Sequence, residues 1–494
     1  MFKKILIANR AEIAVRIIRA CKELGITSAA VYSTADKKTL HTRLADEAYH
    51  LEGNTSSETY LNKDKILALA KEIKADAIHP GYGFFSENAD FIEAVEKAGI
   101  AFIGPSSKSV KMMGSKTAAR ELMKKHNVPI VPGTTESVKS IQEGKKIARE
   151  IGYPILLKAA AGGGGKGMRK IESEKDFDSA FESTKREALK SFANDDVYIE
   201  KFIDEPKHIE VQVFGDKRGN YVHFFERDCS VQRRHQKIIE EAPASVVDEE
   251  TRQRITTAAI NAAKACDYFN AGTIELLMDK NKDFYFLEMN TRLQVEHPVT
   301  ELITGIDLVK EQISVAEGNK LSIKQDDLKI NGHAVECRIY AEDPYNNFLP
   351  STGKITKYVI PAGAGVRVDT GIACDSEISM YYDPMIAKLI CWGADRTEAI
   401  NRLTRALHEY QIAGVTTNIQ FLLSVLENPI YLSGKFDIRF IEKEFEQLIT
   451  NHRNLEELNN AAVIFAALMK NSASLKQQET KAITKNNWPG LLYE

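Results

Sequence analysis

The chain has 494 residues, of which 43% are hydrophobic and 27% charged, as in an ordinary folded protein. This length exceeds the roughly 250–300 residues at which a single hydrophobic core stops growing, so we expect two to four domains. The formal net charge of -3 is close to zero for a chain of this size. Composition therefore gives no indication of a nucleic acid or a membrane surface as partner.

The six cysteines are scattered and form no C-x-x-C pair, so we expect reduced thiols rather than a disulfide framework. Near the N-terminus the apolar run 5–8 ends at Asn9, well short of a secretory signal. No stretch approaches the length of a membrane span. These features predict a cytoplasmic protein.

Strands and helices alternate over the first 105 residues. Short apolar runs at 5–8, 28–32, 77–78 and 100–103 predict strands, with helices after the first run, ending at Gly25, and at 63–73. Such alternation predicts a doubly wound parallel sheet with ligands at the carboxyl ends of its strands. The turn 79–83, His-Pro-Gly-Tyr-Gly, is either a simple connection or the mouth of a site, and the sheet favours the second interpretation.

A glycine-rich segment follows the strand predicted at 154–158. Glycine costs backbone entropy and buries no side chain, so Gly162, Gly163, Gly164 and Gly165 cannot serve core packing. With Lys166 and Gly167 they suit a loop that wraps phosphates with backbone N–H groups. Strand-like residues follow Met168, unlike a Walker motif, so we expect a β-hairpin lid; the alternative is a flexible linker.

The run 208–214 alternates strictly, which places His208, Glu210 and Gln212 on one face of a strand. After the next strand, at 221–226, His235 and Lys237 are also expected in phase. A lone strand histidine is more often structural. A sheet face that gathers this many polar groups instead indicates a bound ligand.

Strands at 273–278 and 284–287, separated by a polar loop, predict a hairpin that brings Glu275 level with Glu288. Alternate strand residues share a face, so Glu288 and Asn290 should point the same way. Two carboxylates and an amide oxygen are hard ligands suited to Mg²⁺ when phosphates complete the coordination. The alternative is a polar strand end with solvated charges.

Beyond the hairpin, Arg292, Gln294 and Glu296 continue at the same spacing of two. A guanidinium, an amide and a carboxylate in this order could bind a small planar oxyanion and remove its proton. Helices are predicted at 249–265 and 302–315. Further on, a strand at 334–340 carries Arg338, the strand-like run 381–390 is the most distinctive of this region, and a helix is predicted at 396–412.

Taken in order, these motifs resemble those of the biotin carboxylases, which belong to the ATP-grasp superfamily. The similarity covers residues 5 to about 440 and is carried by segments 8–10, 79–88, 113–116, 162–169, 208–213, 233–244, 288–301 and 382–389. It implies an α/β and α+β architecture built on the ATP-grasp fold. The expected parts are an N-terminal doubly wound parallel sheet domain at 1–112, an ATP-grasp domain at 113–329 with a mobile glycine-rich lid at about 130–203, a C-terminal mixed β domain at 330–445 and a helical tail at 446–494.

The resemblance implies ATP-dependent carboxylation of biotin with bicarbonate, through carboxyphosphate, as the first half-reaction of a multisubunit carboxylase. ATP and one or two Mg²⁺ or Mn²⁺ ions are the implied cofactors. The chain has no Ala-Met-Lys-Met type turn and no transferase domain. We therefore expect biotin on a separate biotin carboxyl carrier protein, a carboxyltransferase on another subunit and, from the family, a homodimer. The final acceptor, acetyl-CoA, another acyl-CoA or pyruvate, stays open.

The resemblance also assigns roles to residues of this sequence. Catalysis is assigned to Glu296 as base and to Arg338, Arg292 and Lys237. Bicarbonate and biotin would contact Arg292, Gln294, Val295, Tyr82, Gly83 and Arg338. Metal is assigned to Glu275, Glu288 and Asn290. ATP would contact Lys116, Lys158, Gly162, Gly163, Gly164, Gly165, Lys166, Gly167, Met168, Glu200, Lys201, Ile203, His208, Gln232, His235 and Leu277.

Two positions depart from the family pattern. Ala11 stands where the family usually has glycine, a small change unless the backbone φ is positive there. Lys166 stands where many members have arginine, which keeps the charge but loses the forked donor. Two other functions remain possible, namely another ATP-grasp ligase such as a carbamoyl phosphate synthetase or purine-pathway carboxylase, and a non-catalytic nucleotide-binding subunit.

Overall fold

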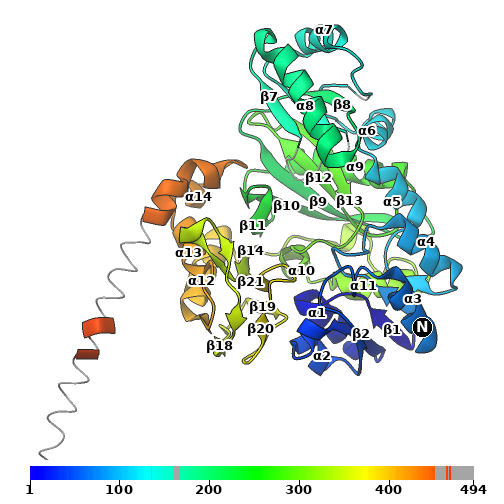
Figure 1. The fold of residues 1–494 in the computed structure, drawn as a ribbon, viewed down its shortest axis with the longest axis vertical. Coiled ribbons are helices and arrows are strands. Elements are labelled where there is room, and N and C mark those ends of the chain that lie inside the picture. Colours follow the sequence, from blue (N-terminus) through cyan, green and yellow to red (C-terminus); the bar gives the residue numbers. More distant parts are fainter. Residues whose placement is uncertain (135, 161–166, 451–462, 466, 469–494) are drawn as a thin grey trace, which may run out of the picture. The chain divides into compact units, whose positions relative to one another are not determined.

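A computed structural model describes residues 1–134, 136–160, 167–450, 463–465 and 467–468. The chain forms two compact units, Met1–Glu444 and Phe445–Glu494. In the second unit the described residues, 445–450, 463–465 and 467–468, are helical. All elements named below belong to the first unit (Figure 1). Within the described part of the chain, no helix is long and apolar enough to cross a membrane.

The N-terminal region is a five-stranded parallel sheet in the order β3-β2-β1-β4-β5, which confirms the predicted doubly wound sheet. Its strands are β1 (Lys4–Ile7), β2 (Thr27–Ser33), β3 (Glu47–Leu51), β4 (Ala77–His79) and β5 (Ala101–Phe102). Its helices are α1 (Ala11–Glu23), α2 (Leu40–Leu44), α3 (Lys63–Glu72), α4 (Ala89–Lys97) and α5 (Ser107–Gly114), with the 3-10 turn η1 (Thr34–Asp36). The sequence interpretation missed β3, an edge strand whose Glu-Ala-Tyr-His-Leu sequence is only partly buried.

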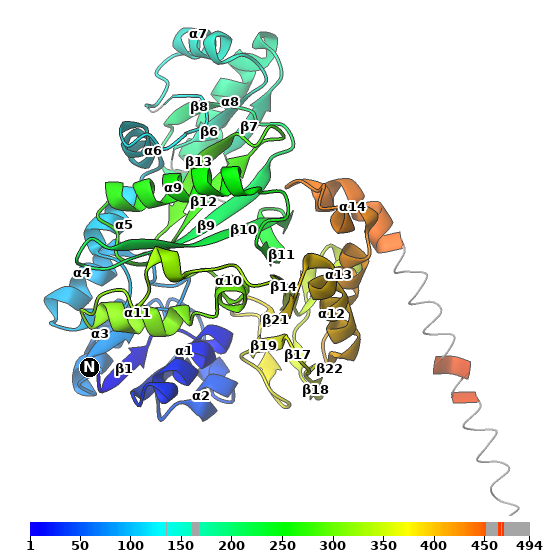
Figure 2. The same ribbon diagram turned by 180° about the vertical axis from the view of Figure 1, so that it is seen from behind.

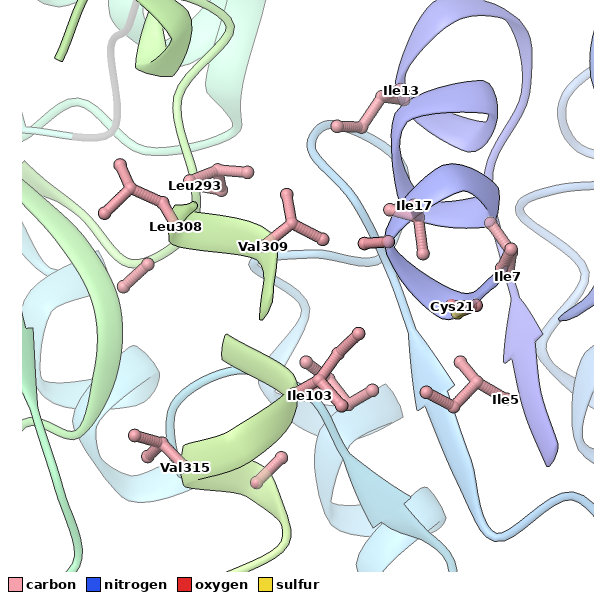
Figure 3. Close-up of a cluster of buried hydrophobic side chains, with 14 of the residues drawn as sticks. Ile5, Ile7, Ile13, Ile17, Cys21, Ile103, Leu293, Leu308, Val309 and Val315 are labelled. Atoms are coloured by element: carbon pink, nitrogen blue, oxygen red, sulfur yellow. The ribbon is translucent and has the colours of Figure 1, made fainter. Parts of the chain in front are cut away.

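Helix α1 packs on this sheet through Ile13 and Ile17, which lie four residues apart and so share one helix face. The same cluster of buried side chains receives Leu308 and Val309 from a later helix, and Leu293 from the segment that carries the predicted oxyanion site (Figure 3). The core of the first sheet therefore also anchors a distant loop of the site.

The lid predicted at about 130–203 contains a three-stranded antiparallel sheet in the order β7-β6-β8. Strands β6 (Ile155–Ala159) and β7 (Met168–Ile171) pair on either side of the glycine segment, which confirms the predicted hairpin. Residues 161–166 at its tip lie outside the described part of the chain. The third strand is β8 (Val197–Lys201), and the other elements of this region are α7 (Ile141–Ile151), η2 (Glu174–Asp176) and α8 (Phe177–Phe192). Helix α6 (Lys116–Lys125) precedes the region.

An eight-stranded antiparallel sheet in the order β13-β12-β9-β10-β11-β14-β21-β19 forms the centre of the first unit. It runs without a break from the segment predicted as an ATP-grasp domain into the predicted C-terminal domain. Its strands are β9 (Lys207–Gly215), β10 (Tyr221–Arg233), β11 (Gln236–Ala242), β12 (Asn270–Met278), β13 (Phe284–Asn290), β14 (His333–Tyr340), β19 (Val366–Thr370) and β21 (Met385–Gly393). Helix α9 (Glu249–Ala265) lies across one face of this sheet (Figure 2). This face is apolar, and Ile255 of the helix packs there with Val211 and Ile274.

Three expectations about this region are wrong. The helix predicted at 302–315 is two helices, α10 (His297–Thr304) and α11 (Leu308–Ala316), because Gly305 ends α10 with a φ of 73° and Asp307 caps α11. His235 is not in a strand with Lys237; it lies in the β10–β11 turn with a φ of 67°. The strand alternation also stops at Asn290, so Arg292, Gln294 and Glu296 are placed by a loop and by the start of α10.

The remaining elements are short strands and helices of the C-terminal region. The strand pairs are β15 (Glu342–Asp343) with β16 (Leu349–Pro350), β17 (Gly353–Lys354) with β20 (Glu377–Ile378) and β18 (Lys357–Val359) with β22 (Gln411–Ala413). The helices are η3 (Gln325–Asp327), η4 (Pro344–Asn346), α12 (Arg396–Glu409), α13 (Ile419–Leu426) and α14 (Pro429–Leu432).

Ala11 has a φ of 57°, in the left-handed region that disfavours residues with a Cβ. Replacing it by glycine removes a strain of about 1–2 kcal/mol, against about 0.4–1 kcal/mol of extra chain entropy in the unfolded state. We expect Ala11→Gly to raise the thermal unfolding midpoint slightly, with a net gain of up to about 1 kcal/mol. Ala14→Gly, within the same helix, is the control and should lower the midpoint; equal destabilisation by both would contradict the strain at Ala11.

Candidate active site

A cavity of about 950 Å³ collects side chains from the N-terminal sheet, the lid and the central sheet. Most residues assigned by the sequence lie in its wall. These are Tyr82, Gly83, Lys158, Met168, Glu200, Lys201, Ile203, His208, Gln232, His235, Lys237, Glu275, Leu277, Glu288, Asn290, Arg292, Gln294, Val295 and Arg338. The structure thus brings together segments that lie more than 250 residues apart in sequence.

The turn after β4 forms one wall of the cavity, and hydrogen bonds from Asn9 hold its backbone. The Asn9 amide donates to the carbonyls of Pro80 at 2.6 Å and Tyr82 at 2.8 Å. His79 is fully buried, and its Nδ1 accepts from the Gly81 N–H at 3.1 Å. A Cβ at Gly81 would lie 2.9 Å from the Asn9 side chain, so glycine is required for this close approach. These bonds fix the direction of Tyr82.

At the lid side, Glu200 forms salt bridges with both Lys158 and Arg120, and Arg120 also donates to the Val131 carbonyl at 2.8 Å. All three charged residues are at most 8% exposed. The sequence interpretation missed Arg120. The Lys201 amine donates to the Gly152 carbonyl at 2.8 Å. Lys116 is the first residue of α6, and Gly167 lies in the turn just before β7 with a φ of 71°. The predicted ATP contacts of the Lys116 side chain, of Gly162–Gly165 and of Lys166 lie outside the described part of the chain.

The predicted metal ligands lie on the paired strands of the β12–β13 hairpin. Glu275 and Glu288 are direct partners in the strand register, as the sequence predicts, and Asn290 lies two residues further along β13. The Asn290 Nδ2 is buried and has no hydrogen-bond partner among the residues that the structure describes, and its Oδ1 accepts from Arg292 at 2.9 Å. Two carboxylates and one amide oxygen form a donor set that fits Mg²⁺ or Mn²⁺.

Lys237 lies at the middle of a group of buried carboxylates. Its ammonium is 2.5 Å from Glu210, 2.9 Å from Glu275 and 2.7 Å from Glu296. Burial alone would lower the pKa of Lys237, but the three carboxylates raise it well above its usual value. The ammonium therefore stays charged and holds three like charges together.

Glu296 is fully buried and also accepts from Arg338 at 2.9 Å. Burial acts to raise the pKa of Glu296, but Lys237, Arg338 and Arg227 bring that pKa well below its usual range. Glu296 is thus an ionised carboxylate near neutral pH. Arg338 is held from its other side by Glu240 at 2.6 Å.

Arg292 is held by a carboxylate from the N-terminal region. Its Nε donates to Glu87 at 2.8 Å, and Glu87 also accepts from the Thr291 N–H at 2.9 Å. The guanidinium further donates to Gln294 Oε1 at 3.2 Å, and Gln294 donates to Glu275 at 3.1 Å. The oxyanion residues predicted by the sequence therefore form one connected network with the metal residues.

Besides Glu240, sequence reasoning missed Glu87, Arg227 and Lys388, which are charged residues that order this network. Glu87 lies within the segment 79–88 but gave no signal of its own. Arg227 is completely buried and donates to Glu210 at 2.5 Å and to Gln212 and Thr300 at 2.9 Å. Lys388, also completely buried, donates to the Val295 carbonyl at 2.7 Å. A charged residue inside an otherwise apolar strand is the signal that could have identified Lys388.

Three family models match consecutive parts of the chain. Residues 1–110 match "Biotin carboxylase, N-terminal domain", residues 115–324 match "Carbamoyl-phosphate synthase L chain, ATP binding domain" and residues 336–443 match "Biotin carboxylase C-terminal domain". Biotin carboxylase 1 of Bacillus subtilis is 52% identical over 443 residues, which cover 90% of this chain and 98% of that protein. The chain belongs to the biotin carboxylase family.

Other members of the biotin carboxylase family are equally similar. A pyruvate carboxylase subunit of Methanothermobacter thermautotrophicus is 53% identical over 443 residues, 90% of each chain. Among solved structures, the biotin carboxylase domain dimer of the Hydrogenobacter thermophilus 2-oxoglutarate carboxylase, in complex with MgADP, ADP and bicarbonate, has a TM-score of 0.86 at 48% identity. That match covers 91% of this chain and 99% of the other. These relatives confirm the ATP-grasp architecture that the sequence resemblance implies.

The buried His79 predicts a pH dependence of stability. Burial lowers the pKa of His79 to about 3, from an ordinary value near 6.5. Below pH 6.5 the unfolded chain therefore binds a proton that the folded chain does not, and stability falls as the pH falls towards 3. His79→Asn keeps an acceptor for Gly81 and removes the titration.

We expect the variant to lose stability between pH 6 and pH 4 less steeply than the parent, by up to about 1.4 kcal/mol per pH unit. Unfolding midpoints in urea at several pH values measure the difference. Parallel pH profiles for the two proteins would contradict a neutral buried His79.

Proposed function

We propose that the chain carboxylates biotin held on a separate carrier protein, using ATP and bicarbonate, and yields N-carboxybiotin, ADP and phosphate. The observation that carries this proposal is the connected network of Lys237, Glu296, Arg292 and Arg338 beside the hairpin carboxylates, in a chain of the biotin carboxylase family. A purely nucleotide-binding protein would have no need to bury an ionised acid between an ammonium and a guanidinium at this place.

In the first step, a bicarbonate oxygen attacks the γ-phosphorus of ATP and gives carboxyphosphate and ADP. Arg292 and Gln294, with the backbone of Val295, bind the bicarbonate, and the ionised Glu296 removes its proton. Lys237 keeps positive charge beside the reacting anions. We assign the nucleotide to the part of the cavity lined by Lys158 and Glu200. Other lining residues assigned to ATP are Met168, Ile203, His208, Gln232, His235 and Leu277.

The hairpin residues Glu275, Glu288 and Asn290 would hold Mg²⁺ or Mn²⁺ in one or two positions. When bound, such an ion offsets negative charge on the phosphate oxygens during phosphoryl transfer. Gln294 donates to Glu275, so the chain itself ties the metal carboxylate to the bicarbonate side.

In the second step, carboxyphosphate breaks down to CO₂ and phosphate. The phosphate takes the proton of the biotin ureido nitrogen, which then attacks CO₂. Arg338 stabilises the oxyanion that develops on the ureido oxygen, while Tyr82 and Gly83 contact the biotin ring. The salt bridge from Glu240 to Arg338 holds the guanidinium in place between these events.

The relatives support the wider setting of the reaction. The matched 2-oxoglutarate carboxylase domain is a dimer with bicarbonate bound, and we propose a homodimer for this chain as well. A biotin carboxyl carrier protein and a carboxyltransferase, each on its own polypeptide, complete the proposed assembly, which acts in the cytoplasm. The transferase selects the final acceptor, since relatives are named for pyruvate, methylcrotonoyl-CoA and 2-oxoglutarate carboxylation.

Replacing Glu296 by alanine tests the proposed base. Because a positioned base contributes about 10²–10⁴-fold, Glu296→Ala should lower bicarbonate-dependent ADP formation by at least 10²-fold. The assay uses the intact chain with free biotin and a coupled measurement of ADP. A variant that stays within tenfold of the parent would show that another group removes the proton.

Replacing Arg338 by alanine separates the two halves of the reaction. Arg338→Ala should keep MgATP affinity, measured by calorimetry, within about threefold and should abolish biotin carboxylation. Glu296 retains Lys237 as a partner in this variant. If MgATP affinity and carboxylation fall together, Arg338 does not act at the biotin step alone.

A further inference from the structure

Lys388 lies in the middle of β21, and almost all other residues of that strand are apolar. Its side chain is completely buried. Burying an ammonium costs several kcal/mol unless hydrogen bonds and opposite charges offset it. The proposed reaction gives this lysine no part, so its partners need an explanation.

The shortest contact of the Lys388 ammonium is with the Val295 carbonyl, at 2.7 Å. Two carboxylates lie further away, Glu12 of α1 at 3.4 Å and Asp369 of β19 at 3.8 Å. Arg367 already holds Asp369 through two hydrogen bonds of 3.0 and 2.8 Å. The ring centroid of Tyr82 lies 6.0 Å from the ammonium. The backbone carbonyl is thus the closest of these partners, and the acids and the ring lie further away.

The Val295 carbonyl is one side of a planar peptide whose other side is the N–H of Glu296. Fixing that carbonyl therefore fixes the backbone from which the Glu296 side chain leaves, at the start of α10. The Val299 N–H donates to the Glu296 carbonyl at 3.3 Å, and not to the Val295 carbonyl as in a regular α-helix. The Val295 carbonyl can therefore accept from Lys388.

Two other contacts hold the preceding residues of this loop. Leu293 is completely buried in the cluster between α1 and α11 (Figure 3), and the Thr291 N–H donates to Glu87 at 2.9 Å. With Lys388 on Val295, the segment 291–296 is attached to three separate parts of the molecule. Arg292, Gln294 and Glu296, between these attachments, line the cavity or border it.

We propose that Lys388 is a positioning residue for the bicarbonate half of the site, acting through the Val295 carbonyl on Glu296 and Gln294. This inference rests on the proposed function, which places bicarbonate beside Arg292. Burial raises the pKa of Glu12 to about 7 even though Lys388 opposes this. The distances, 2.7 Å to the Val295 carbonyl and 3.4 Å to Glu12, show that the carbonyl is the closer partner of the ammonium.

The test replaces Lys388 by methionine, which keeps most of the volume and removes both charge and donor. We expect the KM for bicarbonate to rise at least tenfold and kcat to fall, while the KM for MgATP stays within threefold. Bicarbonate-dependent ADP formation by the intact chain with free biotin gives all three values. An unchanged KM for bicarbonate, or an equal rise in both KM values, would overturn the proposal.

The matched control is Lys207→Met. Lys207 is also a buried lysine of the central sheet, paired with Asp228 at 2.9 Å, and it does not line the cavity. Its loss should lower the unfolding midpoint comparably but leave the KM for bicarbonate within threefold. A rise like that of Lys388→Met would mean that general loosening of the sheet explains the effect. If Lys388→Met does not fold, Lys388→Gln replaces it; glutamine is too short to reach Val295 in the same way, and the same outcomes apply.

Two further variants separate the remaining explanations. If Lys388 served only to neutralise Glu12, the double variant Glu12→Gln with Lys388→Met would recover the KM for bicarbonate, whereas the proposal expects no recovery. Arg292→Ala tests the underlying function and should itself raise the KM for bicarbonate more than tenfold. If Arg292→Ala raises it and Lys388→Met does not, only the inference about Lys388 fails; if neither does, the bicarbonate assignment fails as well.

Discussion

The buried ammonium of Lys237 is the contact on which the site depends. Glu210, Glu275 and Glu296 approach one point from three different elements, and the Lys237 ammonium between them offsets the repulsion of carboxyl groups brought together in a buried place. Breaking such a group by removing one charge typically costs about 3–5 kcal/mol, because uncompensated charge remains buried. The stability of this region and its chemistry therefore rest on the same atoms.

The fold explains why these groups meet. The central sheet is one continuous antiparallel structure, so Glu210 on β9, Lys237 on β11 and Arg338 on β14 share its polar face, while α9 covers the apolar face. The loop 291–296 then adds Glu296 from beyond the sheet's end. Leu293, buried beside α1, ties that loop to the N-terminal sheet (Figure 3). In this way the proposed nucleotide and bicarbonate halves are joined through Gln294 and Glu275.

Much of this arrangement could be predicted from local sequence patterns. The β12–β13 hairpin, with Glu275 opposite Glu288, follows from two apolar runs around a polar loop, and the lid hairpin follows from strands around four glycines. The parallel N-terminal sheet follows from alternating strand and helix patterns, and the full set of motifs identified the family. Each of these signals comes from residues close together in the sequence.

What could not be predicted depends on contacts between distant segments. The spacing of two residues after Asn290 suggested a longer strand. Instead, Leu293 packs in the hydrophobic cluster beside the N-terminal sheet, and Glu296 is the N-cap of α10. His235 was expected on the same strand face as Lys237 because the two residues are two positions apart, but it lies in the β10–β11 turn with a positive φ. Glu87, Arg227 and Lys388 look ordinary in sequence because their partners belong to other strands, helices and loops. Tertiary partners, rather than local propensity, decide such positions.

Isotope labelling of the bicarbonate oxygens tests most directly whether bicarbonate is the nucleophile in this site. If bicarbonate attacks the γ-phosphorus in this site, the inorganic phosphate released with biotin carboxylation must retain one oxygen from bicarbonate. The parent chain is incubated with MgATP, free biotin and ¹⁸O-labelled bicarbonate, and the phosphate is analysed by mass spectrometry at short times. Each phosphate formed should contain one ¹⁸O atom; phosphate without label, in the presence of carboxylated biotin, would contradict an attack of bicarbonate on the γ-phosphorus.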